Sequence, residues 1–176
     1  RLVHGEGDGM PGLIIDIFSS CAVIQAHTQG VFNSVSAIAE AIKSLFKTSI
    51  NTIYCKSKSS MHSQEDDHDF FILGDTPETI AKENGNAFHI NWITGQKTGF
   101  FLDQRPNRKL LGDCIRQLQT VQKEISVLNT FSYSGGFSVY ALAAGASEVA
   151  SVDVSQNAID LCNRNVELNF PGTNAH

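Results

Sequence analysis

The stretch of residues 127–153 constrains the fold of this chain more than any other part. It opens in an apolar run, 125–128, with the length and β-branched character of a buried strand. A polar turn with two glycines follows, then apolar residues at helical spacing, then Gly145, where a helix end favours positive φ. A second apolar run ends at Asp153. This order of strand, turn, helix, strand and acidic residue is half of a doubly wound α/β nucleotide site.

The turn is suited to a ligand that lies close to the backbone. Gly135 and Gly136 have no Cβ atoms, and the helix after them directs its first N–H groups into the turn. Asp153 comes ~20 residues later, at the end of a strand, where a carboxylate accepts hydrogen bonds from ribose hydroxyls. We therefore predict an adenosine-type cofactor, with a tight turn that binds nothing as the alternative.

Glycine spacing separates two classes of adenosine cofactor. A dinucleotide-binding turn reads G-x-G-x-x-G, whereas Phe131 or Ser132 stands at the first glycine position here. A pyrophosphate would have no cradle in such a turn. The sequence thus favours S-adenosylmethionine (SAM) over NAD.

The rest of the chain predicts a small α/β unit upstream of this turn. In this unit we expect a hairpin of strands 13–18 and 21–27, an amphipathic helix over 31–46 capped by Asn33 or Ser34, and strands at 52–54, 70–73 and 88–93. In the second half of the chain we expect two further helices, which begin at Pro106 and at Ser155. His89, on the polar face of its strand, is expected to be a rim histidine rather than a ligand.

Three strings of residues resemble one known family. They are Asn-Thr-Phe-Ser-Tyr-Ser-Gly-Gly-Phe-Ser from Asn129, Ser-Val-Asp-Val-Ser from Ser151, and Gly-Gln-Lys-Thr-Gly-Phe-Phe-Leu-Asp-Gln-Arg from Gly95. The chain is similar to the SAM-dependent methyltransferases of large-subunit ribosomal RNA that make 5-methylcytosine. The likeness starts at Arg1 and covers nearly the whole chain.

The resemblance implies a domain organisation. In that family a PUA domain, a small central α/β domain and a class I methyltransferase domain follow one another. Residues 1–94 then form the central domain, with a mixed or antiparallel sheet, and residues 95–176 form the first part of a Rossmann-like methyltransferase domain. Both ends are expected to be cut, because two parallel strands do not complete a doubly wound sheet.

The resemblance also implies which residues hold SAM. They are Lys97, Thr98, Gln104 and Arg105 in the upstream motif, Phe131, Ser132, Gly135, Gly136 and Phe137 in the turn, and Asp153 with Ser155 on the ribose side. Arg105 can pair with the carboxylate of the cofactor.

The expected reaction places its nucleophile outside this chain. A cysteine thiolate adds to C6 of cytosine so that C5 accepts the methyl group. By resemblance, this cysteine and an Asp-Pro-Pro-like loop lie beyond His176, so no catalytic residue is assigned here. Cys21, Cys114 and Cys162 are expected in the core.

Basic residues are concentrated on the helix that begins near Pro106. A phosphate-facing patch for ribosomal RNA is predicted from Arg108, Lys109 and Arg116, next to Arg105. A solvated helix face is the alternative. The formal net charge of −5 gives no general electrostatic case for nucleic-acid binding, so any RNA contact must be local.

Composition limits the remaining classes. The four cysteines form no C-x-x-C pair, which indicates reduced thiols in a cytoplasmic protein. No apolar run approaches ~20 residues, so no membrane span is expected. His62 and His68 flank an acidic cluster in a polar loop at 55–69, but a solvated loop is favoured over a metal site. A homodimer is left open.

Two other functions stay open. One is a methyltransferase of the same fold that acts on another RNA base or on a small molecule. The other is a non-catalytic RNA-binding or assembly module that has kept the fold.

Overall fold

The computed structural model describes residues 1–58 and 69–176, and the chain divides into two compact units. The first unit comprises Arg1–Ile80 and Ile90–Phe100, and the second comprises Ala81–His89 and Phe101–His176. The division runs through the hairpin of β6 and β7, whereas the sequence-based boundary lies between residues 94 and 95. The tip of the hairpin falls in the second unit because its contacts are made with residues after 100, and composition does not reveal such long-range pairing.

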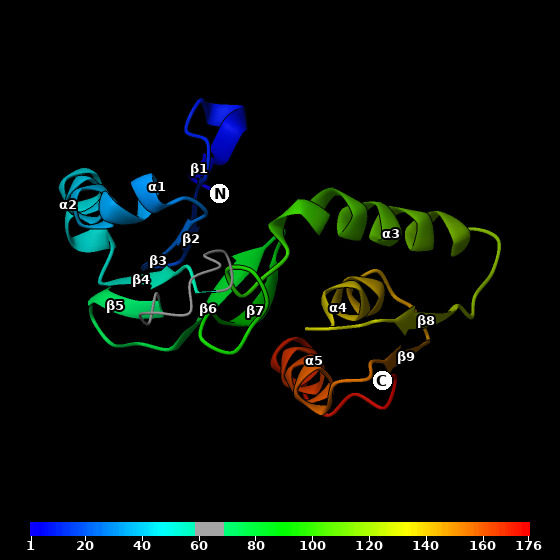
Figure 1. Ribbon diagram of the computed structural model, residues 1–176. Coiled ribbons are helices and arrows are strands. Elements are labelled where there is room, and N and C mark those ends of the chain that lie inside the picture. The colour runs from blue at the N-terminus through cyan, green and yellow to red at the C-terminus, as the bar shows by residue number, and fades with distance from the viewer. Residues whose placement is uncertain (59–68) are drawn as a thin grey trace. The chain divides into compact units, whose positions relative to one another are not determined.

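The first unit is a mixed sheet with helices on it (Figure 1). Its elements are β1 (Val3–His4), β2 (Leu13–Phe18), β3 (Cys21–Ala26), α1 (Gln29–Asn33), α2 (Val35–Phe46), β4 (Thr52–Lys56), β5 (Asp69–Leu73) and the outer parts of β6 (Glu78–Glu83) and β7 (Asn86–Asn91). Among the described residues the sheet order is β1-β2-β3-β4-β5, with β3 and β4 parallel and the other pairs antiparallel. The expectation of a mixed sheet is confirmed.

The helical segment after β3 is divided in two. Thr28 caps α1 by accepting a hydrogen bond from the Val31 N–H at 3.3 Å. The Ser34 hydroxyl donates to the carbonyl oxygen of Gly30, so Ser34 precedes α2 without a side-chain cap, unlike the prediction. The inward residues Val35 and Ala39 of α2 pack into the same hydrophobic core as β2, β3 and β4.

The strand β4 extends further than its sequence suggested. Cys55 and Lys56 were expected in a polar loop, but both are buried in β4. The Lys56 ammonium donates to the backbone carbonyls of Trp92, Ile93 and Gly95, which satisfies a charge that burial would otherwise penalise. The suggested metal ligands of this loop, His62 and His68 with the acids between them, lie outside the described residues.

The second unit contains the predicted strand, turn, helix and strand. Its elements are α3 (Arg105–Leu118), β8 (Ser126–Thr130), α4 (Gly136–Ala143), β9 (Glu148–Val152) and α5 (Gln156–Asn169), with the tip of the β6–β7 hairpin. The strands β8 and β9 are parallel and paired from Ser126↔Glu148 to Thr130↔Val152. Residues of α3, α4 and both strands form one core, in which Ile115, Ala141 and Val149 meet.

The inward face of α3 differs from the predicted apolar stripe. Leu110 is 60% exposed and Cys114 is exposed, so the expectation of a core Cys114 is wrong. Arg108 and Gly112 point inward instead, in line with Ile115. Gly112 faces the side chain of Ala144, and the polar Arg108 satisfies its charge inside the unit. The helix therefore turns a face inward that hydropathy alone would assign to solvent.

No helix in the described part of the chain combines the length and the apolar character that crossing a bilayer requires.

Candidate functional site

The two turns that follow β8 and β9 lie side by side. The parallel register pairs Thr130 with Val152, so the turn after β8 and the carboxylate of Asp153 meet at one edge of the sheet. In the first turn, Phe131 and Tyr133 have φ values of +56° and +44°. Non-glycine residues adopt such angles at a cost, and structures keep them where surrounding contacts over-determine the backbone.

Asp153 ties these two turns together. Its carboxylate accepts hydrogen bonds from the N–H of Tyr133 at 2.9 Å and from the N–H of Ser155 at 3.0 Å. The N–H of Ser155, and next that of Tyr133, lower the pKa of the Asp153 carboxyl, which keeps it ionised. An ionised carboxylate has about four acceptor positions, so two backbone bonds leave capacity for a ribose.

The glycines of the turn make room for protein side chains. A Cβ at Gly135, whose φ is +70°, would overlap the sulfur of Cys162 and lie 3.1 Å from its Cα. A Cβ at Gly136 would lie 3.0 Å from Cδ of Arg108. The positions that their Cβ atoms would take are thus occupied by α5 and α3, while Gly136 also lines the hollow beside α4.

A small hollow opens beside the start of α4. It measures about 100 Å³, and Phe101, Arg108, Phe131, Ser132 and Phe137 are among the residues that line it. Ser132 is only 6% exposed, and within residues 1–58 and 69–176 its hydroxyl has no hydrogen-bond partner. A buried hydroxyl without a partner costs free energy, and a polar ligand group that reached it would remove this cost.

Arg108, which lines this hollow, is half of a buried ion pair. Arg108 donates from Nε and Nη2 to the two carboxylate oxygens of Glu83, at 2.8 and 2.9 Å, and from Nη1 to the carbonyl oxygen of Phe101. Tyr140 donates its hydroxyl to Glu83 Oε1 at 2.9 Å, and burial, followed by this carboxylate, raises the pKa of Tyr140 to about 12. Arg108 is 2% exposed, so its charge serves Glu83 and is not presented to an RNA phosphate as the sequence suggested.

The other two members of the predicted RNA patch are at the surface. Lys109 and Arg116 both contact Asp113 at 2.7 Å, and all three side chains are about half exposed. The N–H donors of these two cations lower the pKa of Asp113, the Lys109 contact first. The trio keeps one net positive charge on the outer face of α3.

Two of the predicted cofactor ligands in the upstream motif, Lys97 and Thr98, belong to the first unit. Thr98 is buried and donates its hydroxyl to Asp16 Oδ2 at 2.6 Å, while Arg1 holds the same carboxylate at 2.8 Å. Lys97 is exposed with φ at +49°. The structure thus engages the Thr98 side chain inside its own unit.

Gln104 and Arg105 lie at the start of α3 without lining the hollow described above. Gln104 accepts a hydrogen bond from Asn107 at 3.0 Å, and Arg105 donates to the side chain of Asn84 at 3.1 Å. The arginine that lines the hollow is Arg108, one helical turn after the motif ends at Arg105.

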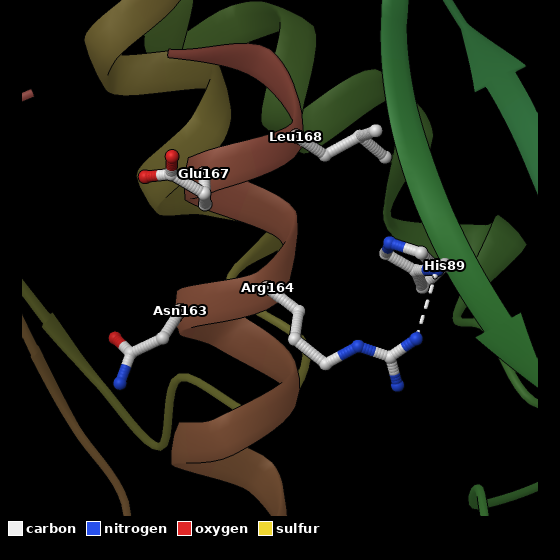
Figure 2. A pocket seen from close by; sticks show the side chains of 5 residues that line it. All are labelled: His89, Asn163, Arg164, Glu167 and Leu168. Carbon is white, nitrogen blue, oxygen red and sulfur yellow. Dashed lines mark hydrogen bonds between the residues drawn. The ribbon is translucent and has the colours of Figure 1, made fainter. Parts of the chain in front are cut away.

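A second, more open hollow of about 470 Å³ lies between α5 and β7. Figure 2 shows Arg164 reaching from α5 towards His89, at 3.1 Å from Nη2 to Nδ1, while Asn163 and Glu167 extend the other way. His89 is half-buried and satisfied by this contact, as its position in the sequence predicted. In the described part of the chain no cluster of three metal-ligating side chains occurs.

Sequence reasoning missed three residues that shape the turn. Tyr133 supplies the N–H that binds Asp153, Glu83 holds Arg108, and Asn165 donates to the carbonyl oxygen of Ser134 at 2.8 Å. Glu83 and Asn165 are polar residues at buried positions, and no local pattern distinguishes them from surface residues. Only their burial in the fold reveals them.

Comparison with known proteins identifies the family of this chain. Residues 24–173 match the model of a family described as S-adenosylmethionine-dependent methyltransferase. The chain belongs to this family. Ribosomal RNA large subunit methyltransferase I from Aeromonas salmonicida (strain A449) is 39% identical, over 96% of this chain and 41% of that protein. The chain therefore spans about two fifths of the length of this relative.

Solved structures agree with the class I methyltransferase fold. A protein from Streptococcus mutans assigned as a SAM-dependent methyltransferase is 25% identical and superposes with a TM-score of 0.81, over all of this chain and 44% of that one. A second methyltransferase-assigned protein, crystallised with S-adenosylhomocysteine (SAH), is 25% identical with a TM-score of 0.80, over all of this chain and 43% of that one.

The residues present fit the cofactor of this methyltransferase family. The Ser132 hydroxyl, which has no partner among the described residues, and the N-terminus of α4 suit a polar, negatively charged end. The ionised Asp153 suits ribose hydroxyls, and Val154 after it is 99% exposed, an apolar surface that the face of an adenine can cover. The hollow has room for about three water molecules, so it suits one end of SAM rather than the whole molecule.

Proposed function

We propose that the protein to which this chain belongs transfers a methyl group from SAM to large-subunit ribosomal RNA, at C5 of a cytosine. The observation that carries the proposal is the position of Asp153 and Ser132 after the carboxyl ends of two parallel strands, in a chain of this family. The Asp153 carboxylate is ionised, and the Ser132 hydroxyl has no partner in the part of the chain that the structure describes. Support for the RNA substrate is the name of the similar Aeromonas protein.

The turn and the strand ends have distinct roles in the proposal. Ser132 and the first N–H groups of α4 bind the methionine carboxylate, with Phe131 and Phe137 beside them. Asp153 accepts hydrogen bonds from the ribose hydroxyls. The N–H of Ser155 donates to the same carboxylate and keeps it oriented. When bound, SAM supplies an electrophilic methyl group. Roles for Lys97, Thr98, Gln104 and Arg105 stay predictions from the resemblance.

The cysteine nucleophile that attacks the cytosine is proposed to come from residues outside 1–176. Burial raises the pKa of the Cys55 and Cys162 thiols, which disfavours the thiolate that must attack C6. Cys21 is buried as well, and the exposed Cys114 lies on the outer face of α3. None of the four has the accessible, activated environment of a nucleophile.

RNA is proposed to contact the outer face of α3 through Lys109 and Arg116. Their charges are at the surface, and they exceed that of Asp113 by one. Contacts of this kind hold phosphates and carry no base specificity. Arg108 is left out of the proposal because Glu83 already neutralises it.

Two measurements on the full-length protein test the proposal. Calorimetry should show binding of SAM and SAH and no binding of NAD. Ribosomal RNA that carries tritium at cytosine C5 should then release tritium in step with methyl transfer, because C5 must lose its hydrogen. Methyl transfer without tritium release would show that the methyl group goes to a position other than cytosine C5. Methylation of a small molecule in place of RNA would exclude RNA as the substrate, and cofactor binding without any methylation would favour a non-catalytic module.

A further inference from the structure

The amide of Asn165 joins the cofactor-binding turn to β7. Asn165, on α5, is fully buried. Its Nδ2 donates to the carbonyl oxygen of Ser134 at 2.8 Å, and its Oδ1 accepts from the N–H of His89 at 2.7 Å. One side chain therefore satisfies a backbone acceptor in the turn and a backbone donor on the strand.

The next turn of α5 repeats half of this arrangement. Asn169 lies four residues on, hence on the same face of the helix. Its Oδ1 accepts from the N–H of Ala87 at 2.8 Å, and its Nδ2 donates to the carbonyl oxygen of Ala87 at 2.7 Å. Both asparagines thus cover backbone groups of β7 with amide groups, but only Asn165 reaches the turn.

The turn needs support of this kind. It contains Phe131, Tyr133 and Gly135, all with positive φ, and two of these are not glycine. Asp153 holds the N–H of Tyr133, and Cys162 packs against Gly135. The carbonyl of Ser134, between them, is held by Asn165, which fixes the peptide plane from which Gly135 leads into α4.

The geometry points to Asn165 as a positioning residue for the cofactor-binding turn. Its amide fixes the orientation of the Ser134–Gly135 peptide, and thereby that of Ser132 and of the first N–H groups of α4. Asn165 does not line the hollow and acts through the backbone it holds. Its relevance to SAM rests on the function proposed above, whereas its effect on the turn does not.

A matched pair of variants tests this inference in the full-length protein. Asn165→Asp keeps the acceptor for the N–H of His89 and replaces the donor to Ser134 by an acceptor. Asn169→Asp makes the same exchange opposite Ala87, one helical turn away. Amide hydrogen exchange without cofactor should be faster at residues 134–136 in Asn165→Asp than in Asn169→Asp. SAH affinity should fall about tenfold in the first and stay within about twofold of wild type in the second.

Each outcome of these measurements supports or overturns the positioning role of Asn165. Equal exchange at residues 134–136 in both variants would overturn the positioning role, whether or not SAH binds. Faster exchange with unchanged SAH affinity would limit the role of Asn165 to the turn and would overturn its link to the cofactor. Asn165→Ala, which buries no charge, replaces Asn165→Asp if that variant does not fold, with Asn169→Ala as its control. Failure of both Asn165 variants to fold would show a general folding role and would also overturn the inference. Absence of SAH binding in the wild type would contradict the proposed function alone.

Discussion

At the scale of single residues, Asp153 has a structural role that the sequence did not predict. It was predicted as a ribose ligand, and the structure shows its carboxylate already holding the N–H groups of Tyr133 and Ser155. The carboxylate is thus oriented by the protein before any ligand binds. Such an arrangement reduces the conformational freedom that ligand binding would otherwise have to restrict.

Replacement of Asp153 should weaken cofactor binding more than folding. We expect Asp153→Ala to lower SAH affinity about tenfold or more, because a charge-assisted acceptor for the ribose is lost. Titration calorimetry measures the affinity, and far-ultraviolet circular dichroism checks the fold. A folded variant with wild-type affinity would show that Asp153 does not contact the ribose.

The lowered pKa of Asp153 also predicts a pH dependence. Its folded pKa lies below the usual value of about 3.9. The stability it contributes is therefore complete above about pH 3.9 and is lost as pH falls through the folded pKa. Urea unfolding of wild type and Asp153→Asn between pH 7 and pH 3 checks this. The gap between the two should be constant at neutral pH and close only in acid, and a gap that closes above about pH 5 would contradict the assignment.

Ser132 should show opposite effects on stability and binding. Its hydroxyl is buried without a partner among the described residues, so Ser132→Ala removes a cost. We expect the free energy of unfolding of the variant, measured by urea unfolding, to equal that of wild type or to exceed it by on the order of 1 kcal/mol. Its SAH affinity should fall. The control is Ser138→Ala. The buried hydroxyl of Ser138 is hydrogen-bonded to Asn129 and Ser151 at 2.7 Å, so its removal should lower the free energy of unfolding of the unliganded protein. Lower stability together with unchanged affinity in Ser132→Ala would contradict this role.

At the scale of elements, the join between β8 and α4 depends on close packing by α5. Gly135 combines positive φ with a Cβ position that Cys162 occupies, so α5 can lie against the turn only if residue 135 is glycine. The same helix supplies Asn165 to the turn and Asn169 to β7. The turn is therefore shaped by an element that follows it in the chain.

A pair of glycine substitutions separates strain from overlap. Gly85 also has positive φ, at +92°, but nothing lies within 4 Å of the Cβ it would carry. Gly85→Ala should cost about 1 kcal/mol of unfolding free energy, from backbone conformation alone. Gly135→Ala should cost a further 1–3 kcal/mol or so, because Cys162 must move. Denaturant unfolding of both variants checks this, and equal losses would show that the packing against Cys162 is not tight.

At the scale of the whole molecule, buried and exposed cations on α3 have different purposes. Arg108 neutralises Glu83 inside the second unit, whereas Lys109 and Arg116 share Asp113 at the surface. Removal of one partner from a buried pair leaves an uncompensated charge, which typically costs about 3–5 kcal/mol. Exposed pairs contribute little to stability and remain available to phosphates.

The two kinds of cation should therefore respond differently to substitution in the full-length protein. The double variant Lys109→Ala/Arg116→Ala should fold normally, bind RNA more weakly, and reduce the slope of log affinity against log salt by about 0.7 per lost phosphate contact. Arg108→Ala should instead lower the melting temperature. Filter binding over a range of salt concentrations and thermal unfolding measure these effects. An unchanged salt slope in the double variant would leave the outer face of α3 with no part in RNA binding.

Much of the fold follows from local patterns in the sequence. The hairpin of β2 and β3, the helix that begins after Ser155 and the strand–turn–helix–strand order up to Asp153 all depend on hydrophobic periodicity and turn chemistry, which act over a few residues. The SAM family could be named for the same reason, since the turn and its acidic partner are nearly contiguous strings. The strand β6 was missed, because Glu78–Glu83 has no clear alternation of apolar and polar residues.

Tertiary structure alone decided which polar residues are inside. Arg108 and Cys114 both lie on α3, and hydropathy placed the cysteine in the core and the arginine in solvent, the reverse of what is found. Arg108 is buried because its charge is neutralised by Glu83, which lies 25 residues away in the chain. Asn165 likewise makes its contacts only because the fold brings His89 of β7 and Ser134 of the turn, which lie 76 and 31 residues earlier in the chain, against α5. Local patterns determine which elements form, whereas the burial of a charge or an amide depends on a partner that only the folded chain brings to it.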